Sequence, residues 1–237
     1  MHPDLGKLLD LQHKDFTLLD VDLRLKGLLN EVAALDQAQS KAGADLDDAR
    51  RALQGGLKKR EEVEANIDGL RVLQERRRQR LDLAKTTREL QALSGELELA
   101  RSVLAKEEAE WFRASEMFSA FEKQLDGATQ RLAELEVTQA TQREELAGRI
   151  AAVQDERRVA EQARRESAVA IERPRLMRYD RLRSVRTTRI VVPLRGDACG
   201  ACFTAVPMSR RNQIRTGLLL DGCEVCGVIL YAAGEEV

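Results

Sequence analysis

Residues 81–90 read Leu-Asp-Leu-Ala-Lys-Thr-Thr-Arg-Glu-Leu, and this stretch decides whether the chain forms one long helix or two. Aliphatic residues recur with heptad spacing from Leu25 to Leu81, and again from Leu90 to Leu146. The step from Leu81 to Leu90 is nine residues rather than seven, so the two registers do not join. Because one unbroken coiled-coil helix would keep a single register, the break indicates a turn.

Thr86 and Glu89 lie inside this break with the spacing of a capping box, in which a hydroxyl and a carboxylate bind the first amides of a helix. We therefore expect a second helix to begin near residue 87. The expected fold class is mainly α, with a long antiparallel two-helix coiled-coil hairpin over residues 1–172 and its tip near residues 83–88. The alternative is one uninterrupted helix that dimerises in parallel.

The tip position also predicts which residues face each other across the hairpin. In this register the bulkiest side chains of the second arm meet smaller positions of the first, as close packing requires. The expected pairs are Trp111 with residues 56–60, Phe118 with Leu53, and Phe121 with Ala49.

The composition of the 237 residues favours helices and argues against a globular enzyme. Aromatic residues make up 3% and charged residues 33%, which is poor material for a large core. No apolar run is long enough to cross a bilayer, and the N-terminus does not resemble a signal peptide. We expect no membrane insertion and a cytoplasmic location. Neither His2 nor His13 has a cysteine near it in the sequence, and no Gly-rich phosphate loop is present, so we expect no enzymatic activity.

Four cysteines near the C-terminus form two Cys-x2-Cys pairs separated by 20 residues. This spacing is typical of a four-cysteine zinc site, in which two tight turns supply a tetrahedral set of thiolates. We expect Gly200 and Gly227 to provide the positive φ of these turns. The sequence predicts a small β zinc ribbon over residues 185–237, after a short helix or linker at 173–184. The expected ligands of one structural Zn²⁺ per chain are Cys199, Cys202, Cys223 and Cys226; a rubredoxin-like iron site and a redox dithiol are alternatives.

Four stretches of the chain resemble motifs of the bacterial coiled-coil/C4-type zinc-ribbon family. They are residues 87–96 at the expected tip, 179–183 before the ribbon, and the two cysteine turns at 199–202 and 223–231. The resemblance implies a kinked helical hairpin with a terminal ribbon, and an adaptor role in flagellar or type III secretion biogenesis. The implied partners are a sigma-54-type sigma factor, export components or RNA. Leu90, Glu224 and Val228 stand where the family usually has Tyr, Pro and Arg.

Arginines gather around the expected ribbon. Residues 173–215 hold eleven arginines and two acidic residues, a formal charge of +9. Because arginine makes forked contacts with carboxylate or phosphate, we predict a surface for a protein partner, with RNA or DNA as the alternative. Pairing of these arginines with the thiolates and with Glu161, Glu166 and Glu172 would leave less charge for a partner. The candidate residues are Arg178, Arg181, Arg183, Arg186, Arg195, Arg210, Arg211 and Arg215.

A second basic cluster falls at the expected tip. Arginines on the first arm lie close to the capping residues, so the tip is a candidate docking site. The alternative is that these arginines pair across the hairpin with Glu89, Glu96 and Glu98. The tip residues are Arg76, Arg77, Arg78, Arg80, Thr86 and Glu89. The sequence thus predicts a non-enzymatic adaptor, and it leaves monomer and dimer equally open.

Overall fold

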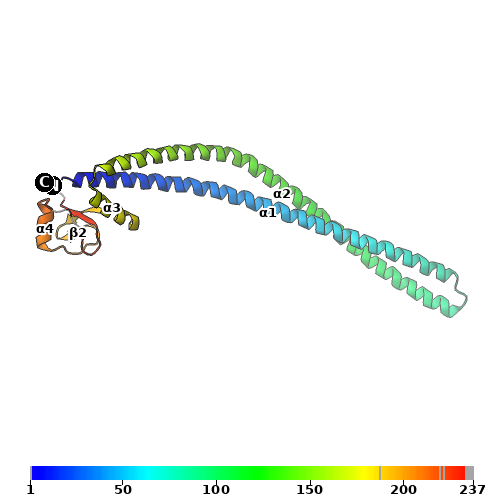
Figure 1. The fold of residues 1–237 in the computed structure, drawn as a ribbon. Helices are drawn as coiled ribbons and strands as arrows, with labels where there is room; N and C mark the ends of the chain where they lie inside the picture. Colours follow the sequence, from blue (N-terminus) through cyan, green and yellow to red (C-terminus); the bar gives the residue numbers. More distant parts are fainter. Residues whose placement is uncertain (1, 187, 219, 221, 233–237) are drawn as a thin grey trace. The chain divides into compact units, whose positions relative to one another are not determined.

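The computed structural model describes residues 2–186, 188–218, 220 and 222–232 (Figure 1). The expected ranges 1–172 and 185–237 also include residues 1, 187, 219, 221 and 233–237, which lie outside the described residues. Within the described part, no helix has both the length and the apolar character needed to cross a bilayer. The elements are α1 (Leu5–Asp82), α2 (Thr87–Val169), α3 (Arg173–Val185), β1 (Val191–Arg195), β2 (Ala198–Cys199), α4 (Met208–Arg215) and β3 (Ile229–Tyr231).

Two long helices dominate the chain, and a small sheet follows them. In Figure 1, α1 and α2 run in opposite directions and pack against each other, joined by the loop between Asp82 and Thr87. This arrangement confirms the expected fold class. The alternative of one uninterrupted helix in a parallel dimer is wrong.

The capping box forms at the turn between the two helices. The Thr86 hydroxyl accepts a hydrogen bond from the Glu89 amide at 3.2 Å, and the Glu89 carboxylate accepts from the amides of Thr86 at 3.2 Å and Lys85 at 3.3 Å. The Thr86 hydroxyl, followed by these two amides, lowers the pKa of Glu89. A negative charge at this end also suits the dipole of α2.

The chain divides into two compact units, which are described separately. We call Val32–Glu144 the arm unit, and Met1–Glu31 together with Glu145–Val237 the base unit. The arm unit contains only parts of α1 and α2, packed through a narrow apolar seam. Its buried cluster consists of Leu46, Ala49 and Ala128, with Leu125 and Leu132 packed against it.

The facing residues of the arm unit differ from the expected pairs by about one heptad. Trp111 lines the same groove as Ile67 rather than facing residues 56–60, and Phe121 packs on Gly56 rather than on Ala49. Phe118 lies under the guanidinium of Arg60, at 4.5 Å from the ring centroid, instead of facing Leu53. The expected pairing was therefore wrong.

The tilt of helical side chains contributes to this difference. Each Cα–Cβ bond leans toward the N-terminus of its own helix, so side chains of two antiparallel helices lean in opposite directions. Contacting residues of α1 therefore lie closer to the tip than a count from the loop midpoint places them. Large side chains still meet small ones, because Phe121 occupies the space that Gly56 leaves.

One buried polar side chain fixes this register. Gln139 is 3% exposed, and its amide donates to the backbone carbonyl of Leu35 at 3.1 Å. Arg143, one turn away, approaches Asp36 at 2.7 Å and donates to Gln39 at 3.2 Å. A slip of either helix would leave the Gln139 amide buried without this acceptor.

In the base unit, the three-stranded sheet packs against the first turns of α1. The strand order is β2-β1-β3, with β1 antiparallel to β2 and parallel to β3. The apolar core includes Leu8, Leu11, Tyr179 and Val191. Gln12 of α1 also binds the chain at the start of β1: its oxygen accepts from the amides of Ile190 and Val191, both at 2.7 Å.

Gly55 and Gly56 form a matched pair that tests the observed packing. An added Cβ at Gly56 would lie 2.8 Å from the Phe121 ring, whereas one at Gly55 would have no neighbour within 4 Å. We expect Gly55→Ala to stabilise the hairpin by about 1 kcal/mol through helix propensity. Gly56→Ala should not show this stabilisation, because the added methyl group would force the Phe121 ring to move. Thermal unfolding followed by circular dichroism measures both variants; an equal rise in melting temperature would contradict the packing.

Candidate metal centre and its surroundings

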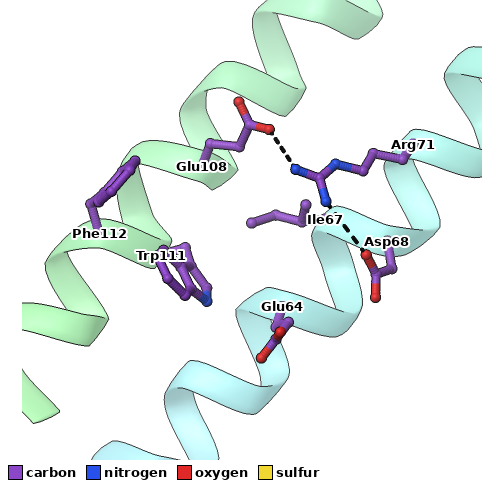
Figure 2. A pocket seen from close by; sticks show the side chains of 7 residues that line it. All are labelled: Glu64, Ile67, Asp68, Arg71, Glu108, Trp111 and Phe112. Carbon is purple, nitrogen blue, oxygen red and sulfur yellow. Dashed lines mark hydrogen bonds and ion pairs between the residues drawn. The ribbon is translucent and has the colours of Figure 1, made fainter.

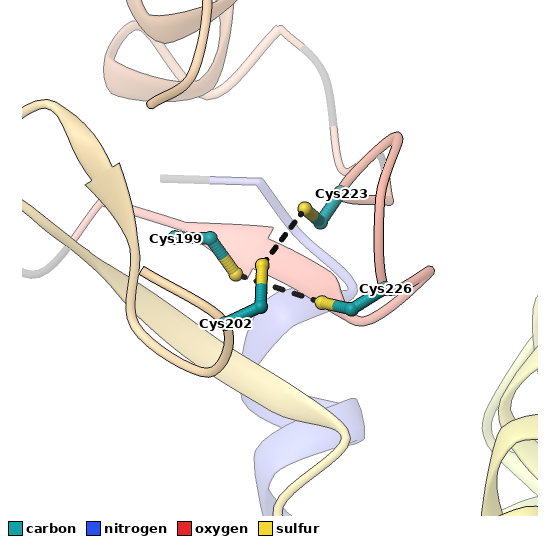
Figure 3. Close-up of side chains that lie close together, drawn as sticks. All are labelled: Cys199, Cys202, Cys223 and Cys226. Carbon is teal, nitrogen blue, oxygen red and sulfur yellow. Dashed lines mark hydrogen bonds between the residues drawn. The ribbon is translucent and has the colours of Figure 1, made fainter. Parts of the chain in front are cut away.

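The four cysteine side chains meet at one point of the base unit (Figure 3). All four sulfur atoms lie within 4.8 Å of one another. The Sγ atoms of Cys199 and Cys226 are 3.8 Å apart, and those of Cys202 and Cys223 are 3.6 Å apart. A tetrahedral ion with metal–sulfur bonds of about 2.3 Å requires sulfur atoms about 3.8 Å apart. The donor set therefore fits a metal ion such as zinc.

The two cysteine turns have the same backbone pattern. The Phe203 amide donates to the Cys199 carbonyl at 2.9 Å, and the Gly227 amide donates to the Cys223 carbonyl at 2.8 Å. Phe203 and Gly227 both directly follow the second cysteine of their turn, and both have a positive φ, of 59° and 76°. Each turn thus directs two sulfur atoms toward the same point.

Gly200 has a different role from the expected one. Its φ is not positive; the left-handed position of the first turn is occupied by Phe203 instead. The Gly200 amide donates to the Pro193 carbonyl at 3.1 Å, and an added Cβ would lie 2.3 Å from that oxygen. Glycine is therefore needed for close approach to β1, and the expected positive φ at this residue was wrong.

In the absence of a metal ion, the thiols differ in acidity. The Thr204 hydroxyl and amide lower the pKa of Cys202 to about 6. Burial raises the pKa of Cys199, and burial raises that of Cys226 to about 12. Because a metal ion binds thiolates, it must displace the protons of Cys199 and Cys226 at neutral pH. Metal affinity therefore falls as the pH falls.

Ion pairs with described residues of the base unit engage Arg183, Arg210 and Arg211 among the candidate arginines. Their charges are partly neutralised inside the chain, so the positive surface is weaker than the formal +9 suggests. None of these three pairs involves the glutamates at 161, 166 or 172. The pairs are Arg183 with Asp15 at 3.1 Å, Arg210 with Glu224, and Arg211 with Asp197.

The other candidate arginines contact different groups of the base unit. Arg181 is exposed, and its guanidinium has no ion-pair partner among the described residues. Arg195 lies 5.8 Å from the centroid of the Phe203 ring. Arg186 donates to the Cys226 carbonyl at 3.0 Å, Arg215 donates to the Gly196 carbonyl at 3.5 Å, and Arg178 lies against Gly222.

Two of the three residues that depart from the resembled family's pattern, Glu224 and Val228, have local roles in the base unit. Glu224, at the usual proline position, pairs with Arg210 and so connects the second cysteine turn to α4. Val228, at the usual arginine position, is fully buried beside the cysteines. Residue 228 is therefore a core residue in this chain, and it offers no side chain to a partner.

The tip arginines show no cross-arm pairing. Within the part of the chain that the structure describes, none of the four has an ion-pair partner. Glu89 is engaged in the capping box, and Glu98 pairs with Arg101. The four are Arg76, Arg77, Arg78 and Arg80, all near the end of α1.

Sequence reasoning missed a buried polar cluster that holds the base unit together. The Asp15 carboxylate accepts hydrogen bonds from the Tyr179 hydroxyl and from Arg164, both at 2.7 Å, and it pairs with Arg183. Tyr179 is completely buried, and burial, followed by its hydrogen bond to Asp15, raises its pKa. One signal was present, since Asp15 interrupts the aliphatic series that includes Leu8, Leu11 and Leu18.

Comparison with known proteins supports the fold alone. No family model and no curated protein matches the sequence. CT398 from Chlamydia trachomatis is similar in structure, with a TM-score of 0.83 and 20% identity over 97% of both chains. The HP0958 protein from Helicobacter pylori has a TM-score of 0.75 and 16% identity over 97% of both chains. A Mycobacterium smegmatis protein has a TM-score of 0.61 and 20% identity, covering 98% of this chain and 100% of its own.

Removing the Asp15 carboxylate tests the buried cluster. Asp15→Ala would leave Arg164, Arg183 and the Tyr179 hydroxyl without their shared acceptor, so we expect a loss of about 3–5 kcal/mol in base-unit stability. Asp10→Ala is the matched control, because Asp10 is an exposed acid of α1 that pairs with Lys14 and accepts a hydrogen bond from Ser167. Limited proteolysis between α3 and β1 measures the effect. Equal cleavage of the two variants would contradict the assigned role of Asp15.

Proposed function

We propose that this protein is a non-enzymatic bacterial adaptor of the coiled-coil/C4-type zinc-ribbon kind. In this proposal, the hairpin carries a ribbon that a structural zinc ion folds, and a protein partner binds at the first cysteine turn. A closed set of four thiolates supports a structural ion, because it leaves no position for water or substrate. The adaptor acts in the cytoplasm, where thiols stay reduced.

The observation that carries the proposal is the conformation of Phe203. Its φ is 59°, in the left-handed region that costs a residue with a side chain about 1–2 kcal/mol. The corresponding position of the second turn is Gly227, which avoids this cost. At Phe203 this conformational cost is not offset by burial, since the side chain is 64% exposed. A strained, exposed aromatic residue is typical of a binding site.

Neighbouring chemistry favours a protein partner over nucleic acid. Val225, between the two cysteines of the second turn, is also exposed, and apolar side chains of this kind contribute to the core of protein interfaces. Several candidate arginines are already paired within the chain, which lowers the charge available to phosphates. The partner that the family resemblance implies is a sigma-54-type sigma factor or an export component.

Metal analysis tests the proposed ion. We expect one zinc per chain. Cys223→Ser should lose the ion and unfold the ribbon, because a domain of this size has too little apolar core without it. Far-UV helicity should stay almost unchanged, since α1 and α2 contain no metal ligand. Iron in place of zinc, or a collapse of helicity, would contradict the proposal.

Phe203→Gly separates stability from binding. Relief of the left-handed strain should stabilise the metal-bound ribbon by about 1 kcal/mol, while loss of the ring should weaken partner binding at least about tenfold. Binding to a purified sigma-54-type sigma factor, measured by fluorescence anisotropy, is the direct assay. Val169→Ala is the control, because Val169 is an exposed apolar residue at the end of α2.

Two outcomes would overturn this assignment. If Phe203→Gly bound the sigma factor as tightly as the unmodified protein, the first cysteine turn would not be part of the interface. A strong shift of RNA or DNA that weakens steeply with salt, together with no binding of the sigma factor, would favour the nucleic-acid alternative.

A further inference from the structure

A groove between α1 and α2 in the arm unit has the chemistry of a second binding site (Figure 2). It offers about 400 Å³ of space. Two adjacent aromatic rings and three carboxylates line it, above the buried side chain of Ile67. The lining residues are Glu64, Ile67, Asp68, Arg71, Glu108, Trp111 and Phe112.

The aromatic pair is only partly covered by the hairpin, since Phe112 is exposed and Trp111 is half-buried. Phe112 is 65% exposed, and its ring meets that of Trp111 edge to face, with centroids 5.5 Å apart. Figure 2 shows the Trp111 ring directed into the space between the helices, with Phe112 beside it. Only Ile67 of the apolar lining is buried, at 5% exposure. The aromatic faces are therefore available to a ligand.

The charge of the groups around these rings determines whether the groove attracts cations or anions. The groove lining carries three carboxylates, from Glu64, Asp68 and Glu108, and one guanidinium, from Arg71, so its formal charge is −2. Such a field repels phosphate groups, nucleic acid and anionic lipid, and it attracts cations. A cation that also stacks on aromatic faces fits the site best.

The groove already holds one guanidinium. Arg71 donates to Glu108 at 3.0 Å and approaches Asp68 at 3.8 Å. Glu64, on the same helix as Asp68, has no ion-pair partner among the described residues. One carboxylate therefore remains available for a further guanidinium, beside the ring of Trp111.

We propose that this groove binds an arginine-bearing peptide segment of a partner protein. A guanidinium of that segment stacks on the Trp111–Phe112 pair and forms an ion pair with Glu64, while an apolar neighbour covers the exposed ring of Phe112. Arginine suits the site better than lysine, because its planar group both stacks and makes forked contacts with a carboxylate. This site is independent of the ribbon and of its proposed function.

The experiment uses the full-length protein and the fluorescence of Trp111, the one tryptophan of the sequence. The probe is a short synthetic peptide of alternating arginine and leucine, added at low salt. We expect a saturable change in emission. Matched peptides with lysine in place of arginine should bind more weakly, and those with the uncharged isostere citrulline should not bind.

Variants that keep Trp111 locate the site. Glu64→Gln and Phe112→Ala should each weaken binding about five- to tenfold, in line with one charge-assisted pair or one stacked ring. Their matched controls are Glu136→Gln and Val137→Ala, which alter an exposed acid and an exposed apolar residue elsewhere on α2. The controls should bind like the unmodified protein, and circular dichroism should show equal helicity in all four variants.

Several results would overturn the proposal. These are the absence of a saturable change with the arginine peptide, equal binding of the citrulline or lysine peptide, and equal affinities of the groove and control variants. Sedimentation of the protein alone gives a further test. Self-association that Glu64→Gln and Phe112→Ala both abolish would assign the groove to a second copy of the chain instead.

Discussion

The base unit depends on one buried carboxylate, that of Asp15. It receives hydrogen bonds from Tyr179 of α3 and Arg164 of α2, and it pairs with Arg183. Because a buried charge without partners costs several kcal/mol, these groups must come together or the unit does not form. The carboxylate thus joins three helices at the point where the hairpin ends and the ribbon begins, and Gln12, one turn earlier, binds the first strand through its side-chain amide.

The arm unit and the ribbon both lack a large apolar core, and they are stabilised in different ways. The arm unit uses a thin seam of aliphatic and alanine residues, with Phe121 filling the space above Gly56. The ribbon has too few apolar residues to be stabilised by such a seam. Its four thiols lie where a tetrahedral ion would bind them all. Exposed aromatic side chains occur in both places, at Phe203 and at Phe112. Neither contributes much to folding, which is why both support proposals about binding.

Much of the fold could be predicted from sequence because the deciding signals are local. The heptad break at residues 81–90 and the capping box of Thr86 and Glu89 place the turn. The spacing of the cysteines predicts that four sulfur atoms meet, and they do. Less could be predicted of the facing pairs, since Trp111 lines a groove with a different part of α1 from the expected one. The ion pairs of Arg183, Arg210 and Arg211 could not be predicted either, because their acidic partners lie outside the helices that carry these arginines.

The sequence by itself determined the helices, their turn and the four-thiol set, since each depends on interactions within a few residues along the chain. Tertiary structure alone decided the register of the hairpin, the Asp15 cluster, the left-handed Phe203 and the acidic aromatic groove. The physical reason is that these features depend on how side chains tilt and meet between segments far apart in sequence. The hydrophobic repeat along one helix shows which face of that helix is buried. Only the packing of the two helices determines which residues contact each other across the seam.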